Sequence, residues 1–221
     1  MDYQFDFGPV LAHWPELLRG TWLTVALTAA ATAIGLPIAA LLAALRSYGP
    51  RPLRWLVSLY VELIRNTPFL IQLYFVFFAL PGLGLRLTAN TAAILAMVVN
   101  LVAYAIEIVR AGLEAIPRGQ IEAGRALGLG PYRILRHIVL AQALRVVYPA
   151  LASQFVLQLL GSSLVSAIAA EELTAVANNI MIVTFRNFEV FGVVTLVYLA
   201  LSLLFRGLLG SVHRFAFRWT G

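Results

Sequence analysis

The sequence has no cysteine, no lysine and only three histidines among its 221 residues. Without cysteine, the chain can form neither a disulfide framework nor a thiolate metal site. The histidines, His13, His137 and His213, lie far apart along the chain, so a histidine metal site is not expected. The phosphate-binding loop of nucleotide hydrolases requires a lysine, which this chain lacks. We therefore expect a chain that binds no cofactor and is not an enzyme, so that any ATP hydrolysis takes place on another polypeptide.

Charge is also scarce. Only 12% of the residues are charged, whereas 61% are hydrophobic and the mean hydropathy is +0.88. A soluble domain has about a quarter of its residues charged, so this composition predicts an all-α integral membrane protein. Crossing the hydrocarbon core as a helix takes roughly 20 apolar residues. Five stretches qualify as predicted spans: 21–45, 57–80, 88–109, 146–168 and 190–209. Because several contain polar residues, a six-span or re-entrant arrangement remains open.

The basic residues predict the orientation in the membrane. All sixteen are arginine, and an outside N-terminus would place twelve of them at or near the cytoplasmic side. Only Arg19, Arg86 and Arg186 would lie outside, and Arg65 would lie within a span. Cytoplasmic loops are enriched in basic residues, so we expect the N-terminus outside and the C-terminus inside. The same rule and an anionic inner leaflet account for the pI near 10.2 without nucleic acid as a partner.

The chain has no repeat and no low-complexity tract, which predicts a single transmembrane domain over residues 1–221. Between the third and fourth predicted spans lies a polar, basic loop, residues 113–137, with room for two short helices joined at Gly128. Such helices often lie on the surface of the inner leaflet. A loop that docks on another protein is the alternative.

The sequence of this loop favours docking. Glu122–Gly128, followed by Ile138–Leu140, resembles in spacing the EAA loop that permease subunits of bacterial ABC importers insert into a groove on their ATPase subunits. The chain departs from that pattern at Gly124, where alanine is usual, and at Ala141, where proline is usual. The resemblance implies an ATPase-docking, or coupling, role for Glu122, Ala123, Gly124, Gly128, Ile138 and Leu140.

Further segments resemble the polar amino acid importers among these permeases. They are Tyr60–Leu73, Tyr104–Gly112, Gly119–Ala123, Ser162–Ser166 and Glu172–Leu173. Many family members have a lysine where this chain has Leu160. The resemblance implies a multi-pass permease of the bacterial inner membrane that imports a polar amino acid or related small solute by alternating access. It also implies a second permease, identical or paralogous, two ATPase subunits that bind ATP and Mg, and an extracytoplasmic substrate-binding protein.

Polar residues inside the spans suggest a lined passage, since uncompensated polar groups in lipid are costly and usually face a cavity or a bundle interior. The candidate passage residues are Glu62, Arg65, Asn66, Thr67, Gln72, Asn100, Tyr104, Glu107, Gln154, Gln158, Ser162, Ser163 and Ser166. Structural roles are the alternative: Glu62 could neutralise Arg65, the serines and glutamines could join helices, and Glu107 could orient the loop through a nearby arginine.

Two other functional classes fit the composition. One is a secondary transporter that uses Glu62, Glu107 or an ion instead of ATP. The other is a passive channel or a structural membrane protein, which would leave the docking loop unexplained. An ATPase subunit that copurifies with the chain would distinguish the importer from both.

Overall fold

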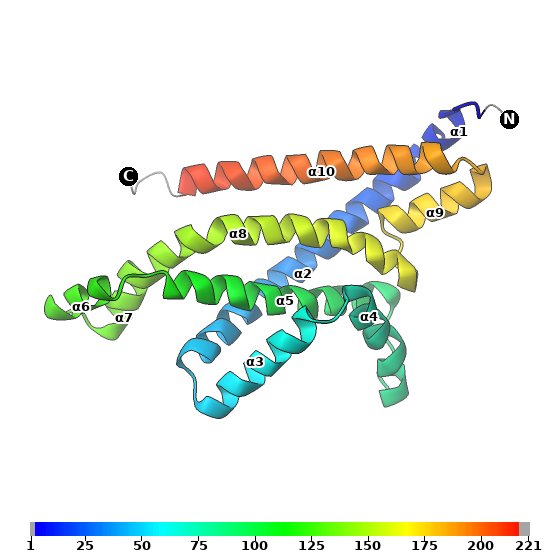
Figure 1. The fold of residues 1–221 in the computed structure, drawn as a ribbon. Helices are drawn as coiled ribbons and strands as arrows, with labels where there is room; N and C mark the ends of the chain where they lie inside the picture. Colours follow the sequence, from blue (N-terminus) through cyan, green and yellow to red (C-terminus); the bar gives the residue numbers. More distant parts are fainter. Residues whose placement is uncertain (1–2, 217–221) are drawn as a thin grey trace.

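The computed structural model describes residues 3–216, and within that range every regular element is helical (Figure 1). Four helical stretches are long and apolar enough to cross a membrane, or five if one bent pair counts as a span. The four are α2 (Trp14–Tyr48), α5 (Ala89–Glu114), α8 with the turn that follows it (Gln142–Ile168) and α10 (Asn187–Ala216). The all-α membrane fold predicted from composition is confirmed.

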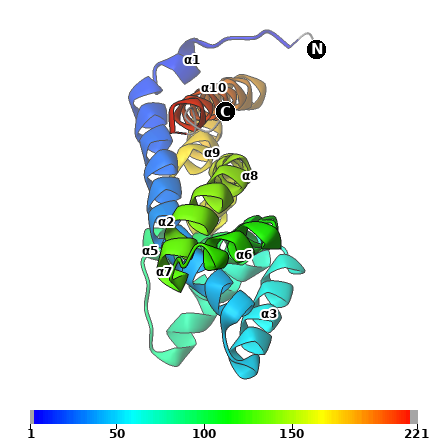
Figure 2. The ribbon, with the colours of Figure 1, turned by 90° about the vertical axis from the view of Figure 1, so that its left-hand side faces the viewer.

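Helix α5 lies at the centre of the bundle, and α2 crosses it at an angle (Figures 1 and 2). Alanines fill the interface of these two helices: Ala31 and Ala39 from α2, and Ala92 and Ala96 from α5, are fully buried. Lipid tails provide no hydrophobic drive between helices, so small residues that permit close backbone approach stabilise such contacts. Helix α8 (Leu140–Gly161) packs on another side of α5, and its chain continues as a 3₁₀ helix (Ser162–Ile168).

The stretch 57–80, expected as one span, is interrupted. Helix α3 (Arg51–Arg65) ends before Pro68, and α4 (Phe69–Tyr74) continues through a π-helical turn and a 3₁₀ turn to Leu83. The two halves are bent by 108°. Proline has no N–H to donate and disfavours helical backbone in the residue before it, which accounts for the break. The pair is a broken span or a re-entrant loop. A re-entrant arrangement was the alternative that the polar residues of this stretch suggested.

A short apolar helix, α9 (Leu173–Thr184), precedes α10 and was not among the predicted spans, because its 12 residues are too few to cross a bilayer. Its N-cap is Glu172, whose buried carboxylate accepts hydrogen bonds from the Ala175 N–H (3.0 Å) and the Tyr198 hydroxyl (2.7 Å). Burial raises the pKa of Glu172, and these hydrogen bonds oppose the shift. One carboxylate thereby joins α9 to α10.

The N-terminal segment, with α1 (Gly8–Leu11), lies against the start of α10. The Tyr3 hydroxyl donates to Glu189, the Asp6 N–H donates to the same carboxylate (3.0 Å), and Arg186 donates to the Gln4 carbonyl (2.9 Å). These contacts hold residues distant in sequence together at one end of the bundle.

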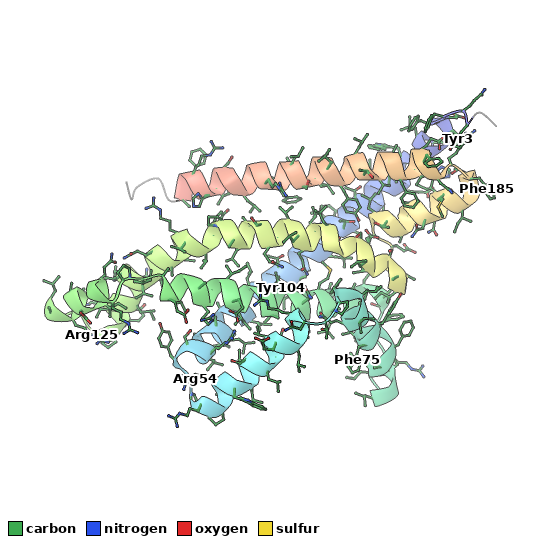
Figure 3. The ribbon with its side chains drawn as sticks, in the orientation of Figure 1. Tyr3, Arg54, Phe75, Tyr104, Arg125 and Phe185 are labelled. Atoms are coloured by element: carbon green, nitrogen blue, oxygen red, sulfur yellow. The ribbon has the colours of Figure 1, made fainter. Side chains whose placement is uncertain are left out.

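The opposite end carries most of the arginines. Helices α6 (Arg118–Ala126) and α7 (Pro131–Ile134) lie there, beyond the end of α5 (Figure 1). Figure 3 shows Arg54 and Arg125 at this end, with Tyr3 and Phe185 at the other. The arginine-rich end comprises Arg46, Arg51, Arg54, Arg110, Arg118, Arg125, Arg133, Arg136, Arg145 and Arg214.

Candidate functional site

The predicted docking loop folds as α6, a tight turn, α7 and a π-helical turn (Leu135–Val139) that leads into α8. Its apolar residues form a small core separate from that of the bundle. Ile116, Ile134, Val139 and Ala143 are buried in it, and Ile121 and Leu129 pack against them. The loop is thus a folded unit with its own packing.

The turn after α6 depends on Gly128, which has a left-handed φ of +75°. The Gly128 N–H donates to the Arg125 carbonyl (2.9 Å), and the Leu129 N–H donates to the Gly124 carbonyl (3.0 Å). These two bonds form a Schellman motif, which satisfies the free carbonyls at a helix end. Apart from its two chain neighbours, a Cβ at Gly128 would meet no atom of the described residues within 4 Å. Within the chain, glycine is therefore required for its backbone conformation and not for close approach.

Gly124 has the opposite surroundings. It is buried, and a Cβ there would lie 2.8 Å from Cδ1 of Ile138 and 3.3 Å from Cγ1 of Ile134. The departure from the usual alanine therefore accompanies a close approach of α6 to the segment that leads into α8. Ile138 is half-buried in this contact.

The outward face of α6 is exposed. Glu122 and Ala123 are exposed, Leu127 is 80% exposed, and no hydrogen bond or ion pair of the Glu122 side chain occurs among residues 3–216. Leu140, at the start of α8, is 41% exposed. Four of the six predicted docking residues are exposed: Glu122, Ala123, Gly128 and Leu140. The other two, Gly124 and Ile138, pack against each other and fix α6 to the segment that leads into α8.

At the helix break, Gln72 has a bracing role. Its amide Nε2 donates to the carbonyls of Ile64 (2.8 Å) and Thr67 (3.0 Å), and its Oε1 accepts from Asn100 (3.0 Å). Carbonyls freed by a break in a membrane helix need donors. Gln72, only 8% exposed, supplies them and ties the break to α5.

The neighbouring charges, Glu62 and Arg65, have separate partners. No ion pair joins Glu62 and Arg65 in the described part of the chain. Instead, Asn66 donates to the Glu62 carboxylate (3.1 Å), and the Arg65 guanidinium carbon lies 5.4 Å from the centroid of the Tyr104 ring. This is cation–π geometry, and it links α3 to α5.

Glu107 is the centre of an ion cluster near the arginine-rich end. It accepts from Arg46 of α2 through one carboxylate oxygen and from Nη2 of Arg110 (3.0 Å) through the other. Arg110 also pairs with Glu114 (2.6 Å), one turn nearer to the docking loop. This geometry agrees with a role for Glu107 in orienting the docking loop through Arg110. The contact with Arg46 was not predicted, because sequence spacing does not relate residues that are 61 positions apart.

In the fourth span, the polar residues are mostly engaged within the protein. Gln158 donates to the Met97 carbonyl of α5 (2.9 Å). Ser162 donates to the Leu159 carbonyl (2.7 Å), and Ser163 and Ser166 likewise bond to carbonyls of their own turns. These contacts match the alternative in which such residues join and cap helices.

A cavity of about 340 Å³ lies between the helix break, α5 and α8. This volume is within the range of small-molecule sites. Its lining includes five of the predicted passage residues, Thr67, Asn100, Tyr104, Gln154 and Gln158. The other eight do not line it: Glu62, Arg65, Asn66, Gln72, Glu107, Ser162, Ser163 and Ser166.

Comparison with known proteins decides the family. The model of the binding-protein-dependent transport system inner membrane component matches residues 35–217. The chain belongs to this family. It is 32% identical to the glutamine transport system permease protein GlnP of Escherichia coli (strain K12), over 96% of this chain and 97% of that protein. It is 38% identical to the L-cystine transport system permease protein TcyB of Bacillus subtilis (strain 168), over 76% of this chain and 72% of that protein.

Solved structures agree with the sequence relatives. A crystal structure of an amino acid ABC transporter with histidines contains a chain with a TM-score of 0.90 and 33% identity, covering 96% of this chain and 99% of that one. An inward-facing structure of the MetNI methionine ABC transporter has a TM-score of 0.73 and 28% identity, over 90% and 94% of the two chains. This family member is thus a multi-pass inner-membrane permease of an ATP-driven importer, working with an ATPase and a substrate-binding protein. The secondary-transporter alternative is not favoured.

Proposed function

We propose that this permease imports a polar amino acid or a related small solute. In this proposal it pairs with a second copy or a paralogue, and two ATPase subunits, which bind ATP and Mg, supply the energy. The names of the relatives support the cargo class, since glutamine and L-cystine are amino acids. The observation that carries the proposal is the combination of a folded, exposed helix in the predicted docking loop and a cavity between α5 and α8 whose mostly apolar wall carries five polar side chains.

The cavity suits a zwitterionic solute. Tyr104 presents an aromatic face and a hydroxyl, and the amides of Asn100 and Gln154 supply both donors and acceptors. Asn100 is already engaged with Gln72, whereas Gln154 makes no hydrogen bond through its side chain in the described part of the protein. Gln154 is therefore the lining residue with the greatest capacity to bond to a cargo.

Replacing Gln154 by leucine should lower ATP-driven uptake of the transported amino acid by roughly three- to tenfold, the effect of losing one or two hydrogen bonds to the solute. Leucine leaves the packing of α8 nearly unchanged in volume, and no bond within the protein is broken. The measurement is uptake into proteoliposomes that contain the ATPase and the binding protein, with a panel of amino acids. Ser153→Ala, on the same helix but outside this cavity, is the matched control.

Uptake that requires no ATP would contradict the importer assignment itself. Uptake by the Gln154→Leu variant at the wild-type rate, with ATP dependence intact, would leave the importer and remove the cavity as its passage.

The arginine-rich end is proposed to face the cytoplasm, with the N-terminus outside. A single cysteine in this cysteine-free chain tests the orientation. Leu83→Cys should react with an impermeant thiol reagent added outside, because Leu83 is 77% exposed in the connection before α5, which this orientation places outside. Tyr48→Cys should not react from outside but should react once the membrane is opened, since Tyr48 is 73% exposed.

Tyr48 is a better position than its neighbour Ser47, whose hydroxyl oxygen is buried, so that a cysteine there could be unreactive for steric reasons. The reverse labelling pattern would place the docking loop outside the cell and contradict the orientation.

A further inference from the structure

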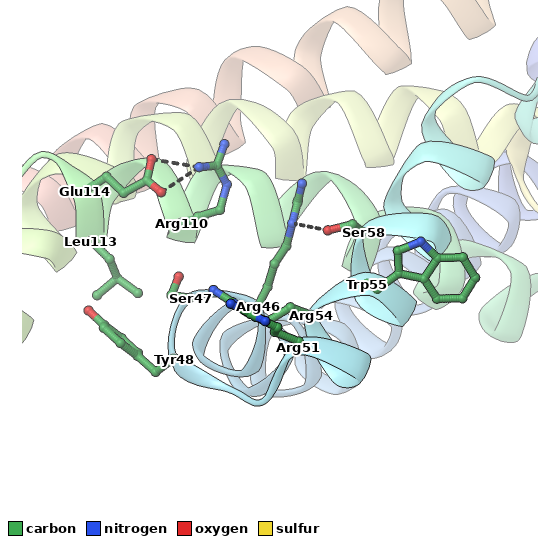
Figure 4. Close-up of a pocket in the computed structure, with 10 residues that line it drawn as sticks. All are labelled: Arg46, Ser47, Tyr48, Arg51, Arg54, Trp55, Ser58, Arg110, Leu113 and Glu114. Atoms are coloured by element: carbon green, nitrogen blue, oxygen red, sulfur yellow. Dashed lines mark hydrogen bonds and ion pairs between the residues drawn. The ribbon is translucent and has the colours of Figure 1, made fainter.

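A second cleft lies outside the proposed passage, at the arginine-rich end between α2, α3 and α5 (Figure 4). Its volume is about 700 Å³. Four arginines line it, Arg46, Arg51, Arg54 and Arg110. In Figure 4 the three arginines of α2 and α3 lie between Tyr48 on one side and Trp55 on the other.

The charges in the cleft are only partly neutralised. Glu107 and Glu114 form ion pairs with the arginines of α2 and α5. The two arginines of α3, Arg51 and Arg54, are exposed and have no ion pair in the described part of the chain. The cleft therefore keeps an excess of two positive charges. Guanidinium groups in this number favour phosphate oxygens, which they bind through paired, charge-assisted hydrogen bonds.

An unsatisfied hydroxyl also lies at the wall of the cleft. The Ser47 oxygen is buried and has no hydrogen-bond partner within residues 3–216. Buried polar atoms in native structures almost always have a partner. Because this oxygen is itself buried, it lies beneath the wall of the cleft beside the arginines and is not among the groups that a ligand in the cleft would contact (Figure 4).

The surroundings of the cleft indicate a membrane surface. It lies where α2 ends and α3 begins, at the end of membrane-crossing helices. Tyr48 and Trp55 are 73% and 64% exposed, and such aromatic residues are enriched at the headgroup level of bilayers. Leu56 and Leu63 continue an exposed apolar face along α3, at 52% and 57% exposure, where acyl chains could lie.

We propose that this cleft binds the phosphate headgroup of an anionic phospholipid, with Arg51 and Arg54 as the principal ligands. The lipid phosphate would supply the counter-charge that the protein lacks, and the acyl chains would pass along the apolar face of α3. Basic pockets between membrane helices bind anionic headgroups in this way. The inference concerns a site separate from the cargo cavity and does not depend on which solute is transported.

The test is native mass spectrometry of the full chain with an equal mixture of phosphatidylglycerol and phosphatidylethanolamine. We expect the wild type to retain phosphatidylglycerol preferentially. In the double variant Arg51→Gln/Arg54→Gln, the ratio of bound phosphatidylglycerol to bound phosphatidylethanolamine should fall roughly tenfold. The variant should still fold, because neither arginine is paired within the described residues. Arg133→Gln/Arg136→Gln, which removes the same charge from the docking loop, is the control and should keep the preference.

Four results would overturn the proposal. The first is equal retention of the two lipids by the wild type. The second is an equal loss in both double variants, which would indicate diffuse attraction and no site. The third is release of the lipid by excess inorganic phosphate, which would indicate a site for a soluble anion. The fourth is release of the lipid on addition of the ATPase subunit, which would make the cleft part of a protein interface.

Discussion

Replacing Gly128 by valine should abolish ATP-driven uptake while leaving the permease in the membrane in normal amount. The reason is the left-handed backbone at this position, φ +75°, on which the Schellman turn after α6 depends. A residue with a Cβ costs about 1–2 kcal/mol in this conformation, and a β-branched residue is a stronger outlier. Valine should therefore unwind the end of α6 and displace the exposed face that carries Glu122 and Ala123.

A series of substitutions separates conformation from bulk. Asparagine tolerates the left-handed region better than other residues with a side chain, and Gly128 has open space around it within the chain. If only the turn matters, Gly128→Asn should retain much of the uptake. If the ATPase subunit approaches Gly128 closely, both variants should fail to stimulate ATP hydrolysis. Normal uptake and normal stimulated hydrolysis by Gly128→Val would exclude the docking assignment.

The sequence indicates either a sharp turn or close approach of another subunit at Gly128, and the structure shows the sharp turn. A glycine after a basic amphipathic stretch indicates either a turn or close contact, and sequence alone does not distinguish them. The structure separates two glycines that look alike in sequence. Gly128 provides a backbone angle, whereas Gly124, four residues earlier, provides space for Ile138.

For the spans, hydropathy predicts which stretches are apolar enough to cross the membrane, but it does not show which of them are continuous helices. Long apolar runs without proline, such as 88–109 and 190–209, became continuous helices because composition alone decides their state in lipid. The run 57–80 is also largely apolar, but Pro68 divides it. Helix α9 was not predicted, because its 12 apolar residues are too few for the length criterion that identifies a membrane span.

Polar residues in the spans were predicted as a group, and their individual roles were not. Hydropathy and helical spacing identify a polar stripe, but they do not show whether its members bond to each other or face a cavity. Gln72 and Gln158 bond to carbonyls, whereas Gln154 lines the cavity without such a bond. Only the three-dimensional arrangement of the helix break, α5 and α8 makes that distinction.

Replacing Gly112 by alanine should reduce the amount of folded permease and its uptake several-fold. Gly112 lies near the end of α5, where α8 crosses close to the base of the docking loop. A Cβ there would lie 2.1 Å from Cγ1 of Val147, which no relaxed contact permits. Valine in a helix has one strongly preferred rotamer, so this methyl group cannot readily turn away. Overpacking of this kind costs typically 1–3 kcal/mol, and it would push α5 and α8 apart.

The clash has a specific remedy within the chain. Val147→Ala removes the methyl group that the new Cβ would meet, and the remaining neighbours, Cβ of Val147 at 3.5 Å and the Ala143 carbonyl oxygen at 3.4 Å, are at ordinary contact distances. Gly112→Ala/Val147→Ala should therefore regain most of the thermal stability in detergent and most of the uptake, whereas Val147→Ala alone should lose a little of both. If the double variant is no better than Gly112→Ala, close approach of α5 and α8 is not the reason for glycine at this position, and the helix crossing that supports the docking loop would have to be different.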